Sequence, residues 1–115
     1  MKIYIFGNGN ISFSDFLKHY ADVLEPFLEE SENQFIVCDF RGVDTLTMEF
    51  LKARTANVDV YHMGERSRYR PDSYHTKVSQ WKSVGDFHSD QERDNAAIEA
   101  CTHFVAIDFN SNEKR

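Results

Sequence analysis

Four short apolar runs, separated by longer polar or amphipathic stretches, constrain the fold of this chain more than any other feature. They are residues 2–6, 34–38, 58–63 and 103–109. Runs of this length bounded by turn residues predict buried strands. Between the first two runs, apolar side chains recur with helical spacing from Phe13 to Leu28, and Pro26 is expected to kink that helix or end it one turn early. Alternating strands and helices predict an α/β fold, with a mainly parallel sheet of four strands or slightly more and helices on both faces.

Hydroxyl and carboxylate side chains mark where the helices are expected to begin. Ser12 and Ser89 each precede an acidic residue with the spacing of a capping box. Asp44 is the expected N-cap of the helix that follows the second strand. Two helical faces are predicted to be buried against the sheet. They consist of Leu46, Phe50 and Ala53 in the helix after the second strand, and of Ala97, Ile98 and Cys101 in the last helix.

The composition is that of one globular, acidic domain spanning residues 1–115. Hydrophobic residues make up 41% of the chain, and its formal net charge of −6 argues against general nucleic-acid binding. No apolar run approaches the roughly 18 residues of a membrane span, and the first run is too short for a signal peptide. Two cysteines without a disulfide framework fit a reducing compartment. The sequence therefore predicts a cytoplasmic protein with no membrane partner and no disulfide.

Residues 65–82 depart from this acidic background. The segment carries five basic side chains against two acidic ones, a local net charge of +3 by subtraction, together with several aromatic residues. Residues 65–88 show no legible helical or strand pattern, and we interpret residues 65–82 as a basic and aromatic insertion within the domain. The basic residues are Arg66, Arg68, Arg70, Lys77 and Lys82.

The turn after the first strand is a candidate phosphate-binding loop, because ligands of parallel sheets bind at the carboxyl ends of the strands. Residues 7–10 read Gly-Asn-Gly-Asn and precede a helix. They supply the start of a G-x-G-x-x-G pattern, which Ser12 leaves incomplete. An ordinary turn is the alternative. No lysine follows with P-loop spacing, so an NTPase of that type is excluded.

The turn after the second strand, residues 38–44, is a second candidate. Gly42 permits a sharp turn, and Arg41 would stand beside a helix N-terminus, where unpaired N–H groups already favour an anion. The arginine would add a bidentate grip on phosphate. In the alternative interpretation, Gly42 serves only the turn, Asp44 serves only the cap, and Arg41 pairs with a nearby carboxylate.

Several further side chains are candidates for ligand binding or catalysis. Trp81 and Tyr69 could stack on a nucleobase, although Trp81 could equally anchor a loop over the core. The carboxylates that could act at a glycosidic bond are Asp39, Glu92 and Asp108. The five histidines and two cysteines lack the spacing of a zinc site, so we expect neither a metal nor another cofactor.

The succession of short motifs resembles the SLOG superfamily of Rossmann-like nucleotide-binding domains, which includes the DprA and lonely-guy proteins. It is most similar to the YspA-like branch. Residues 7–9 followed by Phe13 resemble the Gly-Ser-Arg turn and Phe-led helix that open those proteins. Residues 41–44, Arg-Gly-Val-Asp, are similar to the latter half of their Gly-Gly-Ala-Arg-Gly-Ala-Asp loop. The later matching motifs are Trp81 with Gly85, and Arg93 with Asp94.

This resemblance implies a three-layer sandwich that binds a nucleotide or nucleotide-derived ligand at the carboxyl edge of the sheet, and it implies association into homodimers. Two departures matter. Cys38 and Asp39 stand where the family has Gly-Gly, and an acid there would repel a phosphate unless a cation offsets it. The Gly-rich loop and helix that family members carry after the fourth strand are missing from the sequence. The expected ligand-binding residues are Gly7, Asn8, Gly9, Arg41, Gly42, Asp44, Trp81 and Arg93.

Three functions follow as hypotheses from different classes. The first is binding or sensing of a nucleotide or nucleotide-derived ligand. The second is an enzyme, a nucleoside-phosphate N-glycosidase or a relative of the deoxyribosyltransferases, for which the missing Gly-rich loop removes much of the implied machinery. The third is a protein-interaction module that has kept the fold and lost the ligand, with its aromatic and arginine side chains as anchors.

Overall fold

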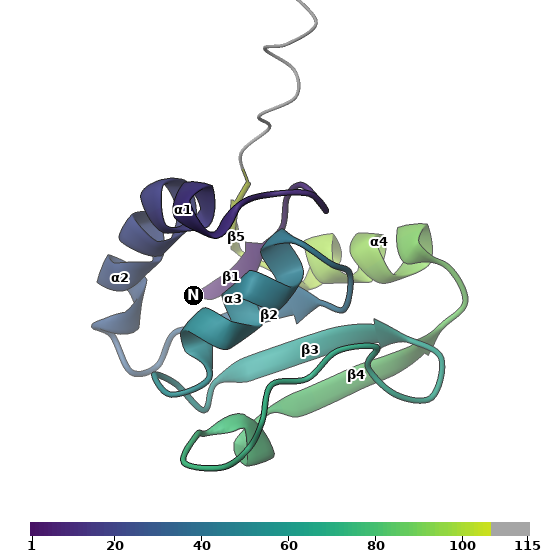
Figure 1. Ribbon diagram of the computed structural model, residues 1–115. Coiled ribbons are helices and arrows are strands. Elements are labelled where there is room, and N and C mark those ends of the chain that lie inside the picture. The colour runs from purple at the N-terminus through teal and green to yellow at the C-terminus, as the bar shows by residue number, and fades with distance from the viewer. Residues whose placement is uncertain (107–115) are drawn as a thin grey trace, which may run out of the picture.

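The computed structural model describes residues 1–106, and within them the chain forms five strands and a series of helices (Figure 1). The strands are β1 (Lys2–Ile5), β2 (Gln34–Cys38), β3 (Val58–Met63), β4 (Lys82–Phe87) and β5 (His103–Val105). The α-helices are α1 (Phe13–Phe16), α2 (Asp22–Leu28), α3 (Val43–Leu51) and α4 (Asp90–Ala100). A π-helical turn, η1 (Leu17–Ala21), joins α1 to α2, and a 3₁₀ turn, η2 (Val78–Gln80), precedes β4.

The strands form one sheet in the order β4-β3-β2-β1-β5, and every neighbouring pair is parallel. The predicted α/β fold with a parallel sheet is therefore confirmed. The strand that was not predicted is β4, which lies within residues 65–88, where the sequence shows no legible pattern. It is an edge strand with most of its side chains exposed, so it lacks the apolar run that marks a buried strand.

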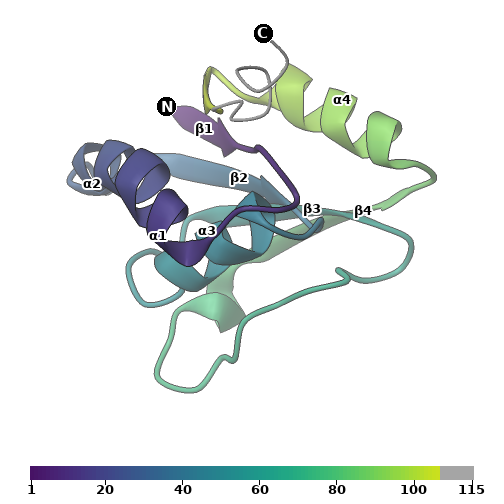
Figure 2. The ribbon, with the colours of Figure 1, turned by 45° about the horizontal axis from the view of Figure 1, so that its top comes forward.

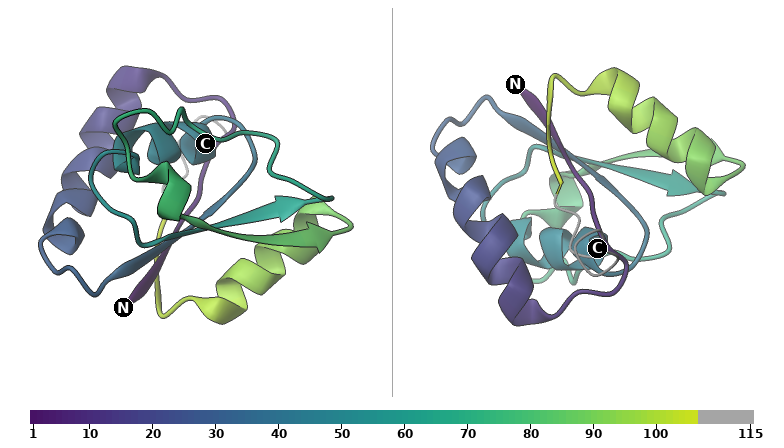
Figure 3. Two further views of the ribbon diagram at one scale, coloured as in Figure 1. Left: turned by 90° about the horizontal axis from the view of Figure 1, so that it is seen from below. Right: turned by 90° about the horizontal axis from the view of Figure 1, so that it is seen from above.

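Helices cover both faces of the sheet and create two cores (Figures 1 and 2). Alternate strand residues divide between them, as the two-residue period of a strand requires. Ile3 and Val37 pack on the side of α1, α2 and α3, whereas Tyr4 and Ile36 pack on the side of α4. The two views of Figure 3 agree that α4 lies alone on its face.

The connection from β3 to β4 crosses the same face as α3. The Lys77 N–H donates a hydrogen bond to the Lys52 carbonyl oxygen at 2.7 Å, and Val78 and Trp81 are buried in the core on that side. In Figure 2 this segment forms a long loop beside α3. The segment therefore packs beside α3 and covers part of the same face of the sheet.

The first helical stretch begins at its predicted N-cap, Ser12, and continues past Pro26. Ser12 and Ser89 accept hydrogen bonds from the N–H groups of Asp15 and Glu92, which confirms both predicted N-caps. Pro26 lies inside α2, which continues to Leu28. The predicted early end is therefore absent.

Both predicted helical faces need correction. The fully buried side chains of α3 are Val43, Thr47, Met48 and Leu51, together with the nearly buried Asp44. The predicted residues Leu46 and Phe50 are half-buried, and Phe50 makes an edge contact with Phe16 of α1. The buried face of α3 thus differs from the predicted one, because the helix packs against α1 as well as against the sheet. Ala53 lies beyond the helix and is exposed.

In α4 the buried residues are Arg93 and Ala97, whereas the predicted core residue Ile98 is 56% exposed. Cys101 is the C-cap and half-buried. The charged residue Arg93 thus occupies a buried position of α4, which a search for apolar residues at helical spacing does not detect. No helix in residues 1–106 combines the length and apolar character needed to cross a bilayer.

Candidate functional site

The two predicted ligand loops meet at the carboxyl edge of β1 and β2. The Val43 N–H donates to the Asn8 carbonyl oxygen at 3.0 Å, and Arg41 Nε donates to the Gly9 carbonyl oxygen at 3.2 Å. Gly42 has a φ of 75°, and a Cβ at this position would lie 2.3 Å from the Asn8 oxygen. Only glycine fits both the backbone conformation and the approach of the first loop. Both loops therefore lie at the carboxyl edge of the sheet, as the prediction of a parallel sheet implied.

The glycines of the first loop make room for side chains. A Cβ on Gly7 would lie 2.2 Å from the Tyr20 hydroxyl, and a Cβ on Gly9 would lie 2.6 Å from the Phe40 ring. The Tyr20 hydroxyl donates to the Phe6 carbonyl oxygen, which ties the π-helical turn to the end of β1. Packing between elements therefore accounts for both glycines.

Asp44 is not the N-cap of α3, which corrects the prediction. The helix begins at Val43 with Gly42 in the capping position, so Asp44 falls within the first turn. Its carboxylate instead accepts a hydrogen bond from the Phe40 N–H at 3.0 Å, closing the turn before the helix. Burial raises the pKa of Asp44 to about 7, and the backbone hydrogen bond and Arg93 offset this only in part.

Asp39 is the centre of a buried ionic network. Its side chain has no exposed surface, and it accepts from Arg93 Nη1 at 2.7 Å and from Arg68 Nε at 3.1 Å. The Arg68 N–H donates to the same carboxylate at 3.0 Å. Burial by itself would raise the pKa of Asp39, but the hydrogen bonds from Arg68 and Arg93 lower it below its ordinary value. The charge of Asp39 is thus offset by these two arginines and not by Arg41.

The arginines of this network extend it to α4. Arg93 is 3% exposed and also pairs with Asp90 at 2.8 Å and Asp94 at 2.9 Å. Arg68 pairs with Asp90 at 3.0 Å, so the segment after β3 is fastened to both the sheet and α4. The predicted ligand role of Arg93 is corrected accordingly, since its guanidinium is buried among three carboxylates. It is a structural residue.

A cavity of about 350 Å³ opens beside this network, between the β2–α3 turn and the segment after β3. The Phe40 ring at its wall is 36% exposed. The guanidinium carbons of Arg41 and Arg68 lie 5.2 and 5.9 Å from the centre of this ring. Arg41 is exposed and makes no ion pair within residues 1–106. The lining residues are Asp39, Phe40, Arg41, Thr45, Arg68 and Tyr69.

Trp81 does not belong to this cavity, which corrects the predicted stacking role. It precedes β4 at the amino edge of the sheet, is 6% exposed, and lies in the core. Its indole Nε1–H donates to the Thr55 carbonyl oxygen at 2.9 Å. The alternative interpretation, a loop anchor over the core, describes its position. Tyr69 does line the cavity, but its hydroxyl is committed to the Glu49 carboxylate.

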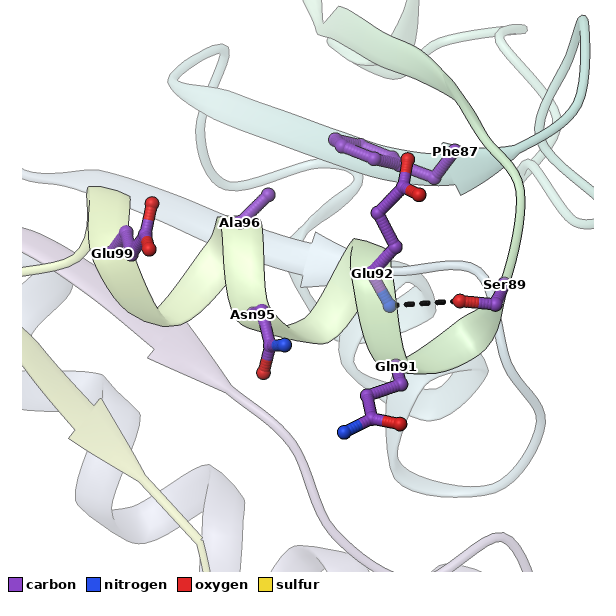
Figure 4. A pocket seen from close by; sticks show the side chains of 7 residues that line it. All are labelled: Phe87, Ser89, Gln91, Glu92, Asn95, Ala96 and Glu99. Carbon is purple, nitrogen blue, oxygen red and sulfur yellow. Dashed lines mark hydrogen bonds between the residues drawn. The ribbon is translucent and has the colours of Figure 1, made fainter.

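The candidate catalytic carboxylates are not brought together among the described residues. Glu92 lines a separate cavity of about 480 Å³ on the outer face of α4, where its side chain points toward Phe87 (Figure 4). That cavity is lined by no basic side chain. Asp39 is fully paired, and Asp108 lies outside the described residues. Within residues 1–106, no group of three or more His, Cys, Asp or Glu side chains has the arrangement of a metal site.

Sequence reasoning missed Phe40 and Thr45, and it saw Arg68 only as one member of a basic segment. A signal for Arg68 was present, because an ionised aspartate buried directly after a strand is usually paired, and the segment 65–82 is rich in arginine. Phe40 carried no such signal. Comparison of the chain with protein-family models, with curated proteins and with solved structures finds no match in any of the three.

Proposed function

We propose that the protein is a SLOG-like domain that binds a nucleotide or nucleotide-derived ligand in the cavity at the carboxyl edge of the sheet. One observation carries the proposal: a partly exposed aromatic ring, Phe40, lies beside two guanidinium groups, and one of these, on Arg41, has no ion-pair partner in the described chain. A planar base and an anionic group are the two parts of a nucleotide, and this pair of side chains is suited to both.

Each lining residue has a role in this proposal. The Phe40 ring offers a face on which a base stacks, a contact worth about 1–3 kcal/mol in other proteins. Arg41 donates charge-assisted hydrogen bonds to the phosphate. Arg68 is held by Asp39 and Asp90, so it positions the wall of the cavity and contributes charge at a fixed place. The volume of about 350 Å³ is near the lower end for small-molecule sites, which favours a ligand of mononucleotide size.

Binding is favoured over glycosidic catalysis by the state of the carboxylates. A nucleophile or general base needs a carboxylate that reaches the substrate. Asp39 has no exposed side-chain surface and accepts from two arginines, and Glu92 lines a different cavity. The described residues therefore offer groups that hold a nucleotide and no group placed to cleave it.

The test is calorimetric titration of the protein with AMP and the other nucleoside monophosphates. Arg41→Ala should weaken binding by about 10- to 100-fold, because a hydrogen bond to a charged group is worth roughly 1.5–3 kcal/mol. Arg66→Ala is the matched control, since Arg66 is an exposed arginine that does not line the cavity. Equal affinities of the Arg41 variant and the wild-type protein would refute the proposed site.

A further inference from the structure

We infer that the ligand carries a single phosphate group on its nucleoside and that polyphosphates are rejected, an inference that rests on the proposed function. Its basis is the balance of charges around the cavity. Nucleotide sites that take polyphosphates supply several cations or backbone N–H groups to the phosphate chain. This edge of the sheet supplies far less.

Two of the arginines near the cavity are already paired with carboxylates of the protein. Arg93 contacts three carboxylates, at 2.7 Å (Asp39), 2.8 Å (Asp90) and 2.9 Å (Asp94). Arg68 contacts the first two of these, at 3.1 and 3.0 Å. Two guanidinium groups therefore face three carboxylates, and this part of the edge has no surplus positive charge.

Arg41 is the one lining cation without a carboxylate partner among the described residues. Its Nε is hydrogen-bonded to the Gly9 carbonyl oxygen, which leaves the other guanidinium nitrogens for a ligand. One guanidinium matches one phosphate in a bidentate pair. A second and third phosphate would find only one other cation in the lining, Arg68, which is already paired with two carboxylates.

The helix beside the cavity does not fill this deficit. The Val43 N–H, at the start of α3, is taken by the Asn8 carbonyl oxygen at 3.0 Å. The buried Asp44 carboxyl lies in the same first turn and adds negative charge whenever it is ionised. The N-terminus of α3 is therefore a poorer anion site than a free helix end.

A series of adenine nucleotides at constant ionic strength tests the inference, because the base is constant and the phosphate count varies. AMP and cyclic AMP, a monoester and a diester with one phosphate each, should bind. ADP and ATP should bind at least about 10-fold more weakly than the better of these two, since each adds charge next to paired carboxylates. Tighter binding of ATP than of AMP overturns the inference and leaves the proposed function standing. Absence of binding by all four overturns both.

A charge variant gives a second readout that does not depend on absolute affinity. Asp94→Asn removes a carboxylate from the shell of Arg93 without removing the Asp39–Arg93 pair. The ratio of ATP to AMP affinity should rise by about 3- to 10-fold. Glu99→Gln, an exposed carboxylate near the opposite end of the same helix, is the control and should leave the ratio unchanged. An unchanged ratio in Asp94→Asn contradicts the charge argument.

Discussion

Replacement of Asp39 by Asn should destabilise the protein strongly, because the carboxylate is the central anion of a buried network. Asn has nearly the same size and keeps one oxygen acceptor, so the change removes charge with little change in packing. Removal of one partner of a buried ion pair costs about 3–5 kcal/mol. The lower end applies here, because Arg93 keeps two other carboxylates and the Arg68 side chain is 45% exposed. We therefore expect a loss of about 3 kcal/mol in the free energy of unfolding.

The loss in free energy is measured by urea unfolding, and the melting temperature by thermal unfolding, both followed by circular dichroism at pH 7. For a domain of 115 residues, about 4 °C of melting temperature corresponds to 1 kcal/mol, so the melting temperature should fall by about 12 °C. Asp22→Asn, at an exposed position in α2, is the control and should change stability by less than about 0.5 kcal/mol. A loss below about 1 kcal/mol for Asp39→Asn would refute the anchoring role.

The stability difference between the wild-type protein and Asp39→Asn should depend on pH, and its sign follows from the lowered pKa of Asp39. A carboxylate with a depressed folded-state pKa stabilises the protein above its unfolded-state pKa, about 3.9, and this stability is lost as the pH falls. The difference between the wild-type and Asn proteins should therefore be full at pH 7 and shrink below about pH 4. A difference that grows in acid would contradict the assigned charge state.

Three other changes probe separate parts of the account. Gly42→Ala should cost more than Gly64→Ala, by about 1–3 kcal/mol in chemical unfolding, because both have positive φ but only a Cβ at Gly42 would strike the Asn8 carbonyl. Asp44→Asn should raise stability at pH 8 by about 2–4 kcal/mol and have little effect at pH 4, since a raised folded-state pKa of about 7 makes the wild-type protein lose stability between these values. Trp81→Phe should lower the melting temperature but leave AMP affinity unchanged, and a loss of affinity would restore its predicted stacking role.

The parallel sheet could be predicted from the sequence because its central strands are continuous apolar runs. Strands β2 and β3 occur at the predicted residues. Strand β4 could not be predicted, because an edge strand exposes its polar side chains and is defined by hydrogen bonds to its neighbour rather than by burial. The buried residues of α3 were predicted wrongly because the helix contacts both α1 and the sheet. A single apolar stripe along the sequence predicts burial against one neighbour only.

The loops of residues 7–10 and 39–44 lie at the edge of the sheet where the sequence predicted them, because each follows a strand of a parallel sheet. The pairing of charges at this edge was not predictable from spacing. Asp39 and Arg93 are 54 positions apart, and the cation that completes their network, Arg68, comes from a third segment. Arg41 was predicted as a phosphate-binding arginine, and the structure adds that it has no ion-pair partner among the described residues.

The most direct test of the central claim is amide NMR of the ¹⁵N-labelled protein during titration with AMP. The account predicts that the largest shift changes fall on Phe40, Arg41 and Thr45 and on the facing residues 68–69, all beside the carboxyl-edge cavity. The indole N–H of Trp81, at the opposite edge, should remain unchanged. Changes concentrated on the outer face of α4, or at Trp81, would place the ligand elsewhere and contradict the account.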